Sequence, residues 1–289
     1  MSVSDLETQR LGPQRARRIS RQHDEERRYL YGRGGNRMGI GPPVTPPVIM
    51  NIMIANGVVF LAQMATSDGR GHDMVSAVGS VTPIEVWQGG EFWQPFTYMW
   101  LHSTASLTHI LFNMFSLWMF GSTLAMYWGE QRFLRYYLTC GFGAGFLIAT
   151  MPYLSNILGF PTPINIPTLG ASGAVYGVLL AFSFTWPDRK IMLLFPPIPL
   201  KALWLIPLLF VMERFFGPPN VSTIGHLGGV IVGWIYLLNE GMTPGAPTLQ
   251  SLQHRWKRYQ MRQRLRSVKM EEERDREQWR DKNRGDRFH

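Results

Sequence analysis

The pattern of hydrophobic and charged positions along the chain predicts six membrane-spanning segments. Asp, Glu, Lys and Arg are absent from three long runs, residues 38–67, 110–129 and 136–187. Because about 20 uncharged, apolar residues span a bilayer, the longest run can hold two passes around a turn. We therefore expect an all-α membrane protein, a bundle of six transmembrane helices at 48–66, 107–128, 133–151, 170–187, 200–216 and 223–240.

The fifth of these segments has the weakest pattern. Its approach contains Pro196, Pro197 and Pro199, and the pair Glu213-Arg214 interrupts its far end. Proline has no backbone N–H and clashes with the preceding helical turn, and a pair of charges is costly inside a membrane span.

Charge divides the chain into three parts, which we predict to be a basic N-terminal tail (1–47), a transmembrane domain (48–240) and a basic C-terminal tail (241–289). The tails hold 22 of the 29 Lys and Arg residues, whereas the middle is close to neutral. A sequence pI near 9.9 can indicate nucleic-acid binding. Basic residues that flank hydrophobic spans instead follow the positive-inside rule for cytoplasmic segments. We expect no nucleic-acid partner, no cleavable signal peptide, and a multi-pass protein of the bacterial cell (inner) membrane with both termini in the cytoplasm.

The connection 67–106 is long and rich in aromatic residues, and it lies on the outer side in this topology. Aromatic rings at this density suit the headgroup zone, so the connection can lie on the bilayer as a membrane-associated loop. A small packed extracellular cap accounts for the same residues equally well. The C-terminal tail has two readings as well, a basic helix on anionic lipid or a solvated tail, and the solvated tail is favoured. The lone Cys140 cannot form an intrachain disulfide.

Three predicted helices carry isolated polar residues at a similar depth. The residues are His109 and Asn113 on the second segment, Ser172 on the fourth and His226 on the sixth. Counted along each helix from its first cytoplasmic charge, Asn113, Ser172 and His226 lie roughly 21 to 25 Å above the inner boundary, at 1.5 Å per residue. The hydrocarbon layer is about 30 Å thick, so these three lie just below the outer surface.

These residue types suit nucleophilic acyl transfer. A histidine whose pKa lies near neutral pH can take the proton of a serine hydroxyl and return it to a leaving amine. Ser172 would then be the nucleophile and His226 the base. His109 and Asn113 are four residues apart on one helix face, so both can point at a developing oxyanion. Tyr176, one turn after Ser172, is placed to pack against the His226 ring. No carboxylate is predicted in this layer, so we expect a dyad rather than a triad.

Each of these residues, taken singly, also has a structural interpretation. Polar side chains in membrane helices often hydrogen-bond to a neighbouring helix, and His102 is best placed as an interfacial loop residue. Glycines spaced four apart are typical of close helix packing. Such packing would bring the fourth and sixth segments near enough for their polar residues to meet. The repeats are Gly225, Gly229 and Gly233; Gly173 and Gly177; and Gly141 and Gly145.

The motifs resemble those of the rhomboid intramembrane serine proteases. Gly170-Ala171-Ser172-Gly173 is similar to the family's G-x-S-G motif, and His226-Leu227-Gly228-Gly229 with Gly233 to its H-x-x-G-x-x-x-G helix. THILFNMFSLWMFG, residues 108–121, resembles its H-x-x-x-N helix. The resemblance implies a rhomboid-like bundle, a Ser172–His226 dyad, and an oxyanion hole formed by His109, Asn113 and the Ser172 backbone, with Gly170 leaving room beside it. Two departures are Gln94, where the family often has Arg after Trp93, and Ala125, where it often has Glu.

We therefore predict an intramembrane serine endopeptidase that cleaves transmembrane or juxtamembrane segments of other membrane proteins. Its partners would be those substrates and the lipid bilayer, with no cofactor and no metal. The resemblance also implies that substrate would enter from lipid through a gate between the fifth segment, with Trp204 and Phe210 as candidates, and the second, with Phe112. Two other classes predict different behaviour: a binding protein that holds membrane segments without cutting them, and a transporter or channel with a histidine relay. A metalloprotease is disfavoured because the chain has no H-E-x-x-H motif.

Overall fold

A computed structural model describes residues 41–192, 198–216 and 222–240 of the 289-residue chain. The chain divides into two units at Pro43 and Val44, and every helix and strand discussed below belongs to the second unit. The predicted tail 241–289 lies outside the described residues, as does the tail 1–47 up to residue 40. The predicted roles of both tails therefore stay predictions.

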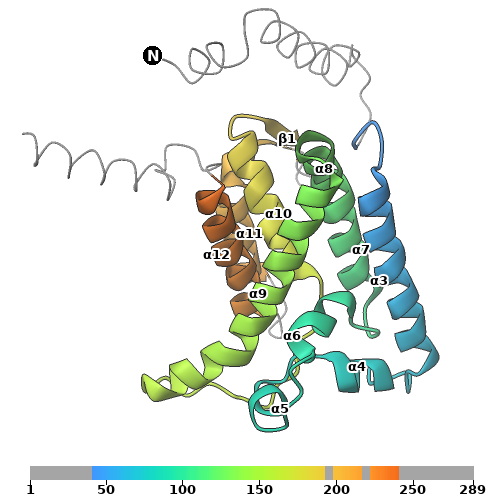
Figure 1. Ribbon diagram of the computed structural model, residues 1–289, viewed down its shortest axis with the longest axis vertical. Coiled ribbons are helices and arrows are strands. Elements are labelled where there is room, and N and C mark those ends of the chain that lie inside the picture. Colours follow the sequence, from blue (N-terminus) through green and yellow to red (C-terminus); the bar gives the residue numbers. More distant parts are fainter. Residues whose placement is uncertain (1–40, 193–197, 217–221, 241–289) are drawn as a thin grey trace, which may run out of the picture. The chain divides into compact units, whose positions relative to one another are not determined.

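A helix occupies each of the six segments predicted from the hydrophobic pattern (Figure 1). The second is one continuous helical stretch that contains a short π-helical section, and a positive φ at Gly129 separates it from the third. The helices are α3 (Pro47–Ala65), α7 with η2 and α8 (Leu107–Ser116, Leu117–Gly121, Ser122–Trp128), α9 (Glu130–Ile157), α10 (Ser172–Thr185), α11 (Leu205–Phe216) and α12 (Thr223–Asn239).

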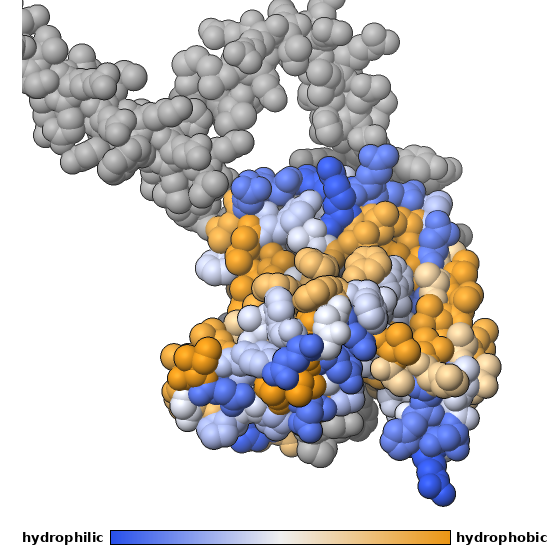
Figure 2. Space-filling model, turned by 60° about the horizontal axis from the view of Figure 1, so that its bottom comes forward, coloured by the Kyte–Doolittle hydropathy of each residue, from blue (hydrophilic) through white to orange (hydrophobic). Residues whose placement is uncertain are grey.

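Three of these helical stretches are long and apolar enough to cross a membrane, namely residues 47–65, 107–128 and 130–157. The helices α10 and α12 are also apolar but shorter. Figure 2 shows hydrophobic side chains, drawn in orange, in patches along both flanks of the visible face, with hydrophilic side chains along its upper and lower edges. The protein is thus a mostly helical membrane protein, and the count of six passes stays a prediction.

The predicted start of the fifth helix is wrong. Residues Pro199–Lys201 form a strand, β2, which pairs antiparallel with β1 (Lys190–Met192), and a 3₁₀ turn over Ala202–Trp204 follows before α11 begins. Proline at 199 disfavours a helix at this point, and the hairpin supplies the backbone partners that a helical turn would otherwise provide. The remaining α11 has 12 residues and is about 18 Å long.

The connection 67–106 folds into short helices at one end of the second unit (Figure 1). The side chain of Gln94 is fully buried among them: its Oε1 accepts from the backbone N–H of Thr82 at 2.9 Å, and its Nε2 donates to Glu85 and Glu91 at 2.9 and 2.6 Å. Glutamine therefore anchors this connection at the position where the resembled family often has arginine. The helices are α4 (Met74–Gly79), α5 (Pro83–Trp87), α6 (Gln94–Thr97) and η1 (Tyr98–Trp100).

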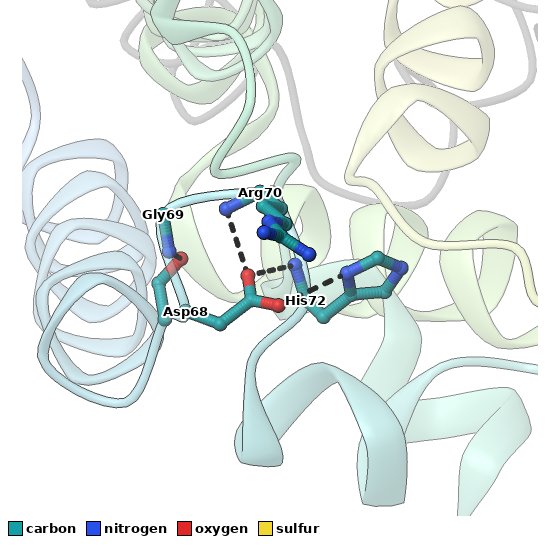
Figure 3. Close-up of polar contacts among 5 residues, drawn as sticks. Asp68, Gly69, Arg70 and His72 are labelled. Carbon is teal, nitrogen blue, oxygen red and sulfur yellow. Dashed lines mark hydrogen bonds and ion pairs between the residues drawn. The ribbon is translucent and has the colours of Figure 1, made fainter.

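An exposed polar turn joins α3 to this connection (Figure 3). The Oδ1 atom of Asp68 accepts from the backbone N–H groups of Arg70 and His72 at 2.8 and 3.2 Å, and its Oδ2 lies 3.3 Å from Nδ1 of the His72 ring. Gly69 adopts a φ of +76°, which suits a residue without a Cβ. Short-range bonds to one carboxylate thus hold this turn.

Helix α10 lies at the centre of the bundle, where it contacts α9, α11, α12 and the η2 section (Figure 1). Most of its side chains from Gly173 to Ser183 are buried, and several of them are small, so that the neighbouring helices can pack closely around it. Tyr136 of α9 donates its hydroxyl to the carbonyl of Gly177 at 2.7 Å, and Cys140 is buried with a free thiol. The next residues to place are those at the start of this central helix.

Candidate active site

Backbone bonds hold the segment that leads into α10. Val81 and Thr168 exchange two backbone hydrogen bonds of 2.8 Å, and the N–H of Gly170 donates to the carbonyl of Tyr98 at 2.9 Å. The Tyr98 side chain is itself buried, and its hydroxyl donates to the carbonyl of Gly141 at 2.8 Å. The connection 67–106 and α9 therefore position Ser172, the first residue of α10.

Glycines set the register between α10 and α12. A Cβ added at Gly173 would lie 3.2 Å from the carbonyl oxygen of Gly225, and one added at Gly177 would lie 3.3 Å from that of Gly229. A Cβ on Gly229 would overlap the carbonyl of Gly173. The two helices run parallel with their backbones touching, as the repeats of small residues predict. Ser172 and His226 each directly adjoin one of these facing glycines.

The ring of His226 stacks on the ring of Tyr176. Their centroids are 4.2 Å apart and their planes differ by 9°. Only 11% of the His226 side chain is exposed. This contact confirms the packing predicted for Tyr176, and it places the imidazole beside the first turn of α10, which begins with Ser172.

The structure contradicts the prediction that no carboxylate lies near the histidine. Oε2 of Glu213, on α11, lies 2.6 Å from Nδ1 of His226. The same carboxylate accepts from the hydroxyl of Thr223 at 2.6 Å and from that of Tyr176 at 3.2 Å. The Glu213 side chain is only 9% exposed.

Sequence reasoning missed Glu213 because it compared depths only along the second, fourth and sixth segments. Glu213 was interpreted as a charge that ends the fifth. A signal was present, however: the residue lies 13 positions before His226, near the end of a helix that a short connection joins to the next one. Residues at such distances from a connection lie at similar heights on neighbouring helices.

His109 and Gly170 lie together beside Ser172. A Cβ added at Gly170 would lie 2.8 Å from Nε2 of His109 and 3.7 Å from the hydroxyl oxygen of Ser172. The backbone N–H of Ser103 donates to Nδ1 of His109 at 3.3 Å. In the neutral ring this bond leaves the proton on Nε2, so the ring presents an N–H donor on its Gly170 side.

The side chain of Asn113 is bonded within its own helix. It is buried, and its Nδ2 donates to the carbonyl of His109 at 2.9 Å. The structure thus brings His109, Gly170 and Ser172 together and brings Tyr176 and His226 together, while Asn113 lies one turn after His109. A direct contact between Ser172 and His226 stays a prediction.

His102 lies outside the helices, as predicted for a loop residue, but its side chain is fully buried rather than exposed at an interface. Its ring lies edge-on to that of His109, with centroids 5.1 Å apart. Burial, with a smaller contribution from His109, lowers the pKa of His102 to about 3, so this ring is neutral near pH 7. His102 thus supports one face of the His109 ring without adding charge.

The three aromatic residues predicted to form an entrance differ in their surroundings. The ring of Phe210 on α11 packs against that of Tyr176, with centroids 5.4 Å apart. Trp204 and Phe112 are largely exposed, at 57% and 65%. Phe210 therefore adjoins the residues around His226, and the other two present their rings outward.

Comparisons with known proteins agree on one family. A family model described as "Rhomboid domain" matches residues 89–240, which is more than half of the chain. Rhomboid protein 1, mitochondrial, of Saccharomyces cerevisiae is 33% identical over 132 residues, covering 44% of this chain and 36% of that protein. Rhomboid protease GluP of Bacillus subtilis is 31% identical over 147 residues, covering 50% of this chain and 25% of that protein.

A third relative is the presenilin-associated rhomboid-like protein, mitochondrial, of Bos taurus. It is 30% identical over 136 residues, covering 46% of this chain and 34% of that protein. The chain thus spans between a quarter and about a third of the length of these three relatives. The matched region contains every residue of the candidate site.

Proposed function

The chain belongs to the rhomboid family, and on this premise we propose that it is an intramembrane serine endopeptidase that cleaves transmembrane or juxtamembrane segments of other membrane proteins. One observation carries the proposal. The glycine-packed register of α10 and α12, together with the Tyr176–His226 stack, brings an imidazole to the helix turn that begins with Ser172. Serine and histidine in this arrangement suit acyl transfer.

In the proposed mechanism the hydroxyl oxygen of Ser172 attacks the carbonyl carbon of the substrate, and Nε2 of His226 takes the hydroxyl proton. His226 returns this proton to the leaving amine nitrogen as the peptide bond breaks, which leaves an ester on Ser172. Water, deprotonated by the same imidazole, then releases the carboxyl product. Water must therefore reach Ser172.

Hydrogen-bond donors beside Ser172 would stabilise the oxyanion. The Nε2–H of His109 and the backbone N–H of Ser172 at the start of α10 are the first two, and a rotated Asn113 side chain is the third. The absence of a side chain at Gly170 leaves the space that the oxyanion requires. Tyr176 would orient the base by holding its ring.

The proposed topology has six passes with both termini in the cytoplasm, which rests on the charge pattern of the sequence. The relatives come from mitochondria as well as from a bacterium, so they give no support to the bacterial inner membrane in particular. Substrate would enter from lipid between α11 and α7. A helical substrate hides its carbonyls in its own hydrogen bonds, so small residues and helix-breaking Gly or Pro near the cleaved bond should favour cleavage.

The test is cleavage of a fusion substrate by the purified chain in liposomes, together with labelling by a fluorophosphonate, which reacts with activated serines. We expect Ser172→Ala to abolish labelling, and Ser172→Ala and His226→Ala each to lower kcat/KM by at least about 10³-fold. Cleavage by either variant at the wild-type rate would exclude the mechanism. A wild-type protein that retains membrane segments without cutting them would instead support a binding function.

A further inference from the structure

The carboxylate of Glu213 joins three helices around His226. Glu213 itself belongs to α11, Tyr176 to α10, and Thr223 and His226 to α12. Its Oε1 accepts from Thr223, and its Oε2 lies within hydrogen-bonding distance of both Tyr176 and His226. All three groups approach one largely buried side chain.

We propose that Glu213 is a positioning residue for the base of this enzyme, which makes the catalytic unit a Ser–His–Glu triad rather than a dyad. The inference rests on the proposed function, since it concerns how His226 acts on Ser172. An ionised carboxylate can only accept hydrogen bonds, so the 2.6 Å contact requires the proton of a neutral ring to be on Nδ1. That tautomer leaves the lone pair of Nε2 free to accept the proton of Ser172.

The carboxylate also acts on the charged state of the ring. When the hydroxyl proton moves from Ser172 to Nε2, the imidazole becomes an imidazolium with a proton on each nitrogen. Glu213 stays ionised throughout and stabilises this cation across the short contact. The proton then passes from Nε2 to the leaving amine, so atoms and charge balance with no proton taken up by Glu213.

The other two contacts of Glu213 hold the carboxylate in place. The hydroxyls of Thr223 and Tyr176 satisfy further lone pairs of a group that is 9% exposed. A buried carboxylate without such donors would be costly. Tyr176 thereby supports His226 in two ways: its ring stacks on the imidazole, and its hydroxyl donates to Glu213.

A purely structural role for Glu213 makes different predictions. Glu213 would then act as a latch between α11 and its neighbours, and its replacement would loosen α11 and lower the unfolding temperature. Substrate entry would change, so KM would move more than kcat. A positioning role instead predicts a change in kcat and in the reactivity of Ser172 with little change in KM.

The experiment uses the full chain in liposomes and compares Glu213→Gln with Glu213→Asp. Glutamine preserves the shape but loses the charge, and aspartate preserves the charge on a shorter side chain. We expect Glu213→Gln to lower kcat by about 10²- to 10⁴-fold, with KM within about threefold of wild type. Fluorophosphonate labelling of Ser172 should slow by a similar factor. The kcat of Glu213→Asp should be at least about tenfold higher than that of Glu213→Gln.

Glu240→Gln is the matched control. Glu240 directly follows α12, at the end away from His226, and its carboxylate pairs with Arg132 at 2.6 Å. The same change of carboxylate to amide there should leave kcat within about threefold of wild type, because the ion pair is partly exposed. Thr223→Val removes the hydroxyl that donates to Oε1 of Glu213, and its kcat should lie between that of this control and that of Glu213→Gln.

Three results would overturn the inference. In the first, Glu213→Gln has a kcat within threefold of wild type. In the second, Glu213→Gln and Glu213→Asp are equally slow, and both unfold at a lower temperature. In the third, KM changes while the rate of labelling does not. If the wild type cleaves and Ser172→Ala does not, any of these results rejects only the role of Glu213. An inert wild type instead rejects the proposed function, and the role of Glu213 with it.

Discussion

Two sides of α10 hold the candidate site in different ways. Toward α12 the contact is between backbones, with Gly173 and Gly177 facing Gly225 and Gly229. Toward α11 the contact is between side chains, through the rings of Tyr176 and Phe210 and the hydroxyl bond to Glu213. A glycine contact has no rotamer that can adjust, whereas a side-chain contact can break and form again.

This difference assigns different tasks to the two sides. The α10–α12 side carries Ser172 and His226, and in the proposed mechanism their relative position must hold to within a fraction of an ångström for proton transfer. The α11 side carries Glu213 and borders the proposed entrance for substrate. If α11 moves outward to admit substrate, the backbone contacts of α12 can persist while the carboxylate leaves the imidazole. The proposed reaction would then require α11 to move back until the carboxylate contacts the imidazole again.

The largest effect on stability is expected at the glycine side. In Gly229→Ala the new methyl group would overlap the carbonyl of Gly173, so α12 must move away from α10. We expect a loss of about 3 kcal/mol or more in the free energy of unfolding, with at least a 10²-fold loss of kcat/KM. Thermal unfolding in detergent and cleavage in liposomes measure the two effects.

Gly57→Ala is the control for this substitution. Gly57 lies within α3, and a Cβ there has no atom within 4 Å among the residues that the structure describes. Alanine favours helix over glycine by about 1 kcal/mol, so this variant should be unchanged or slightly more stable. Equal behaviour of the two variants would mean that the glycine contact does not set the position of α12.

A second, smaller effect is expected at Gly170. Its φ is +133°, and an added Cβ would lie 2.8 Å from Nε2 of His109. If His109 is an oxyanion donor as proposed, Gly170→Ala should displace it and lower kcat by about 10²-fold, while the helix packing persists. Gly90→Ala controls for backbone strain, because Gly90 has a φ of +77° and its Cβ would have open space. If both variants lose activity equally, strain rather than the contact with His109 is the cause.

On the α11 side, we expect Tyr176→Phe to lower kcat by less than the glycine substitutions do. This change removes the hydroxyl bond to Glu213 but keeps the ring that stacks on His226. Glu213 retains Thr223 and His226 as partners, so we expect kcat to fall by about three- to tenfold, the value of roughly one hydrogen bond. Cleavage kinetics would measure this. A loss as large as that of Gly229→Ala would contradict the contrast between the two sides.

Much of the helical framework could be predicted from the sequence because it depends on local patterns. The hydrophobic pattern located the six predicted helices apart from the start of the fifth, and the glycine repeats predicted that the fourth and sixth touch. The stack of Tyr176 on His226 also followed from helical spacing, since Tyr176 lies one turn after Ser172. These features need only the period of a helix and the size of a side chain.

Features that depend on distant partners could not be predicted in this way. The hairpin of β1 and β2 shortens α11 because Pro199 favours an extended backbone that pairs with Met192. Burial of His102 results from tertiary packing against His109, which nothing in the local sequence indicates. Glu213 looked like the end of a span, and its partners come from two other helices.

The smallest effect is expected at the exposed turn of Asp68, which tests whether burial gives the contacts of Glu213 their weight. The backbone N–H of Arg70, followed by the bonds from His72, lowers the pKa of Asp68 from its usual 3.8. A lowered pKa means that the ionised carboxylate stabilises the turn above pH 3.8 and that this contribution disappears as the pH falls through the lowered value. The protection of the amides of residues 66–74, measured as their hydrogen-exchange rate relative to that of an unstructured peptide at the same pH, should therefore fall in acid, and Asp68→Asn should abolish that loss of protection. Asparagine keeps an acceptor for both N–H groups, and exposed ion pairs contribute little, so cleavage should stay within about twofold of wild type. A larger loss, comparable to that of Tyr176→Phe, would mean that polar contacts to a carboxylate matter here whether or not they are buried, and burial would no longer explain the role of Glu213.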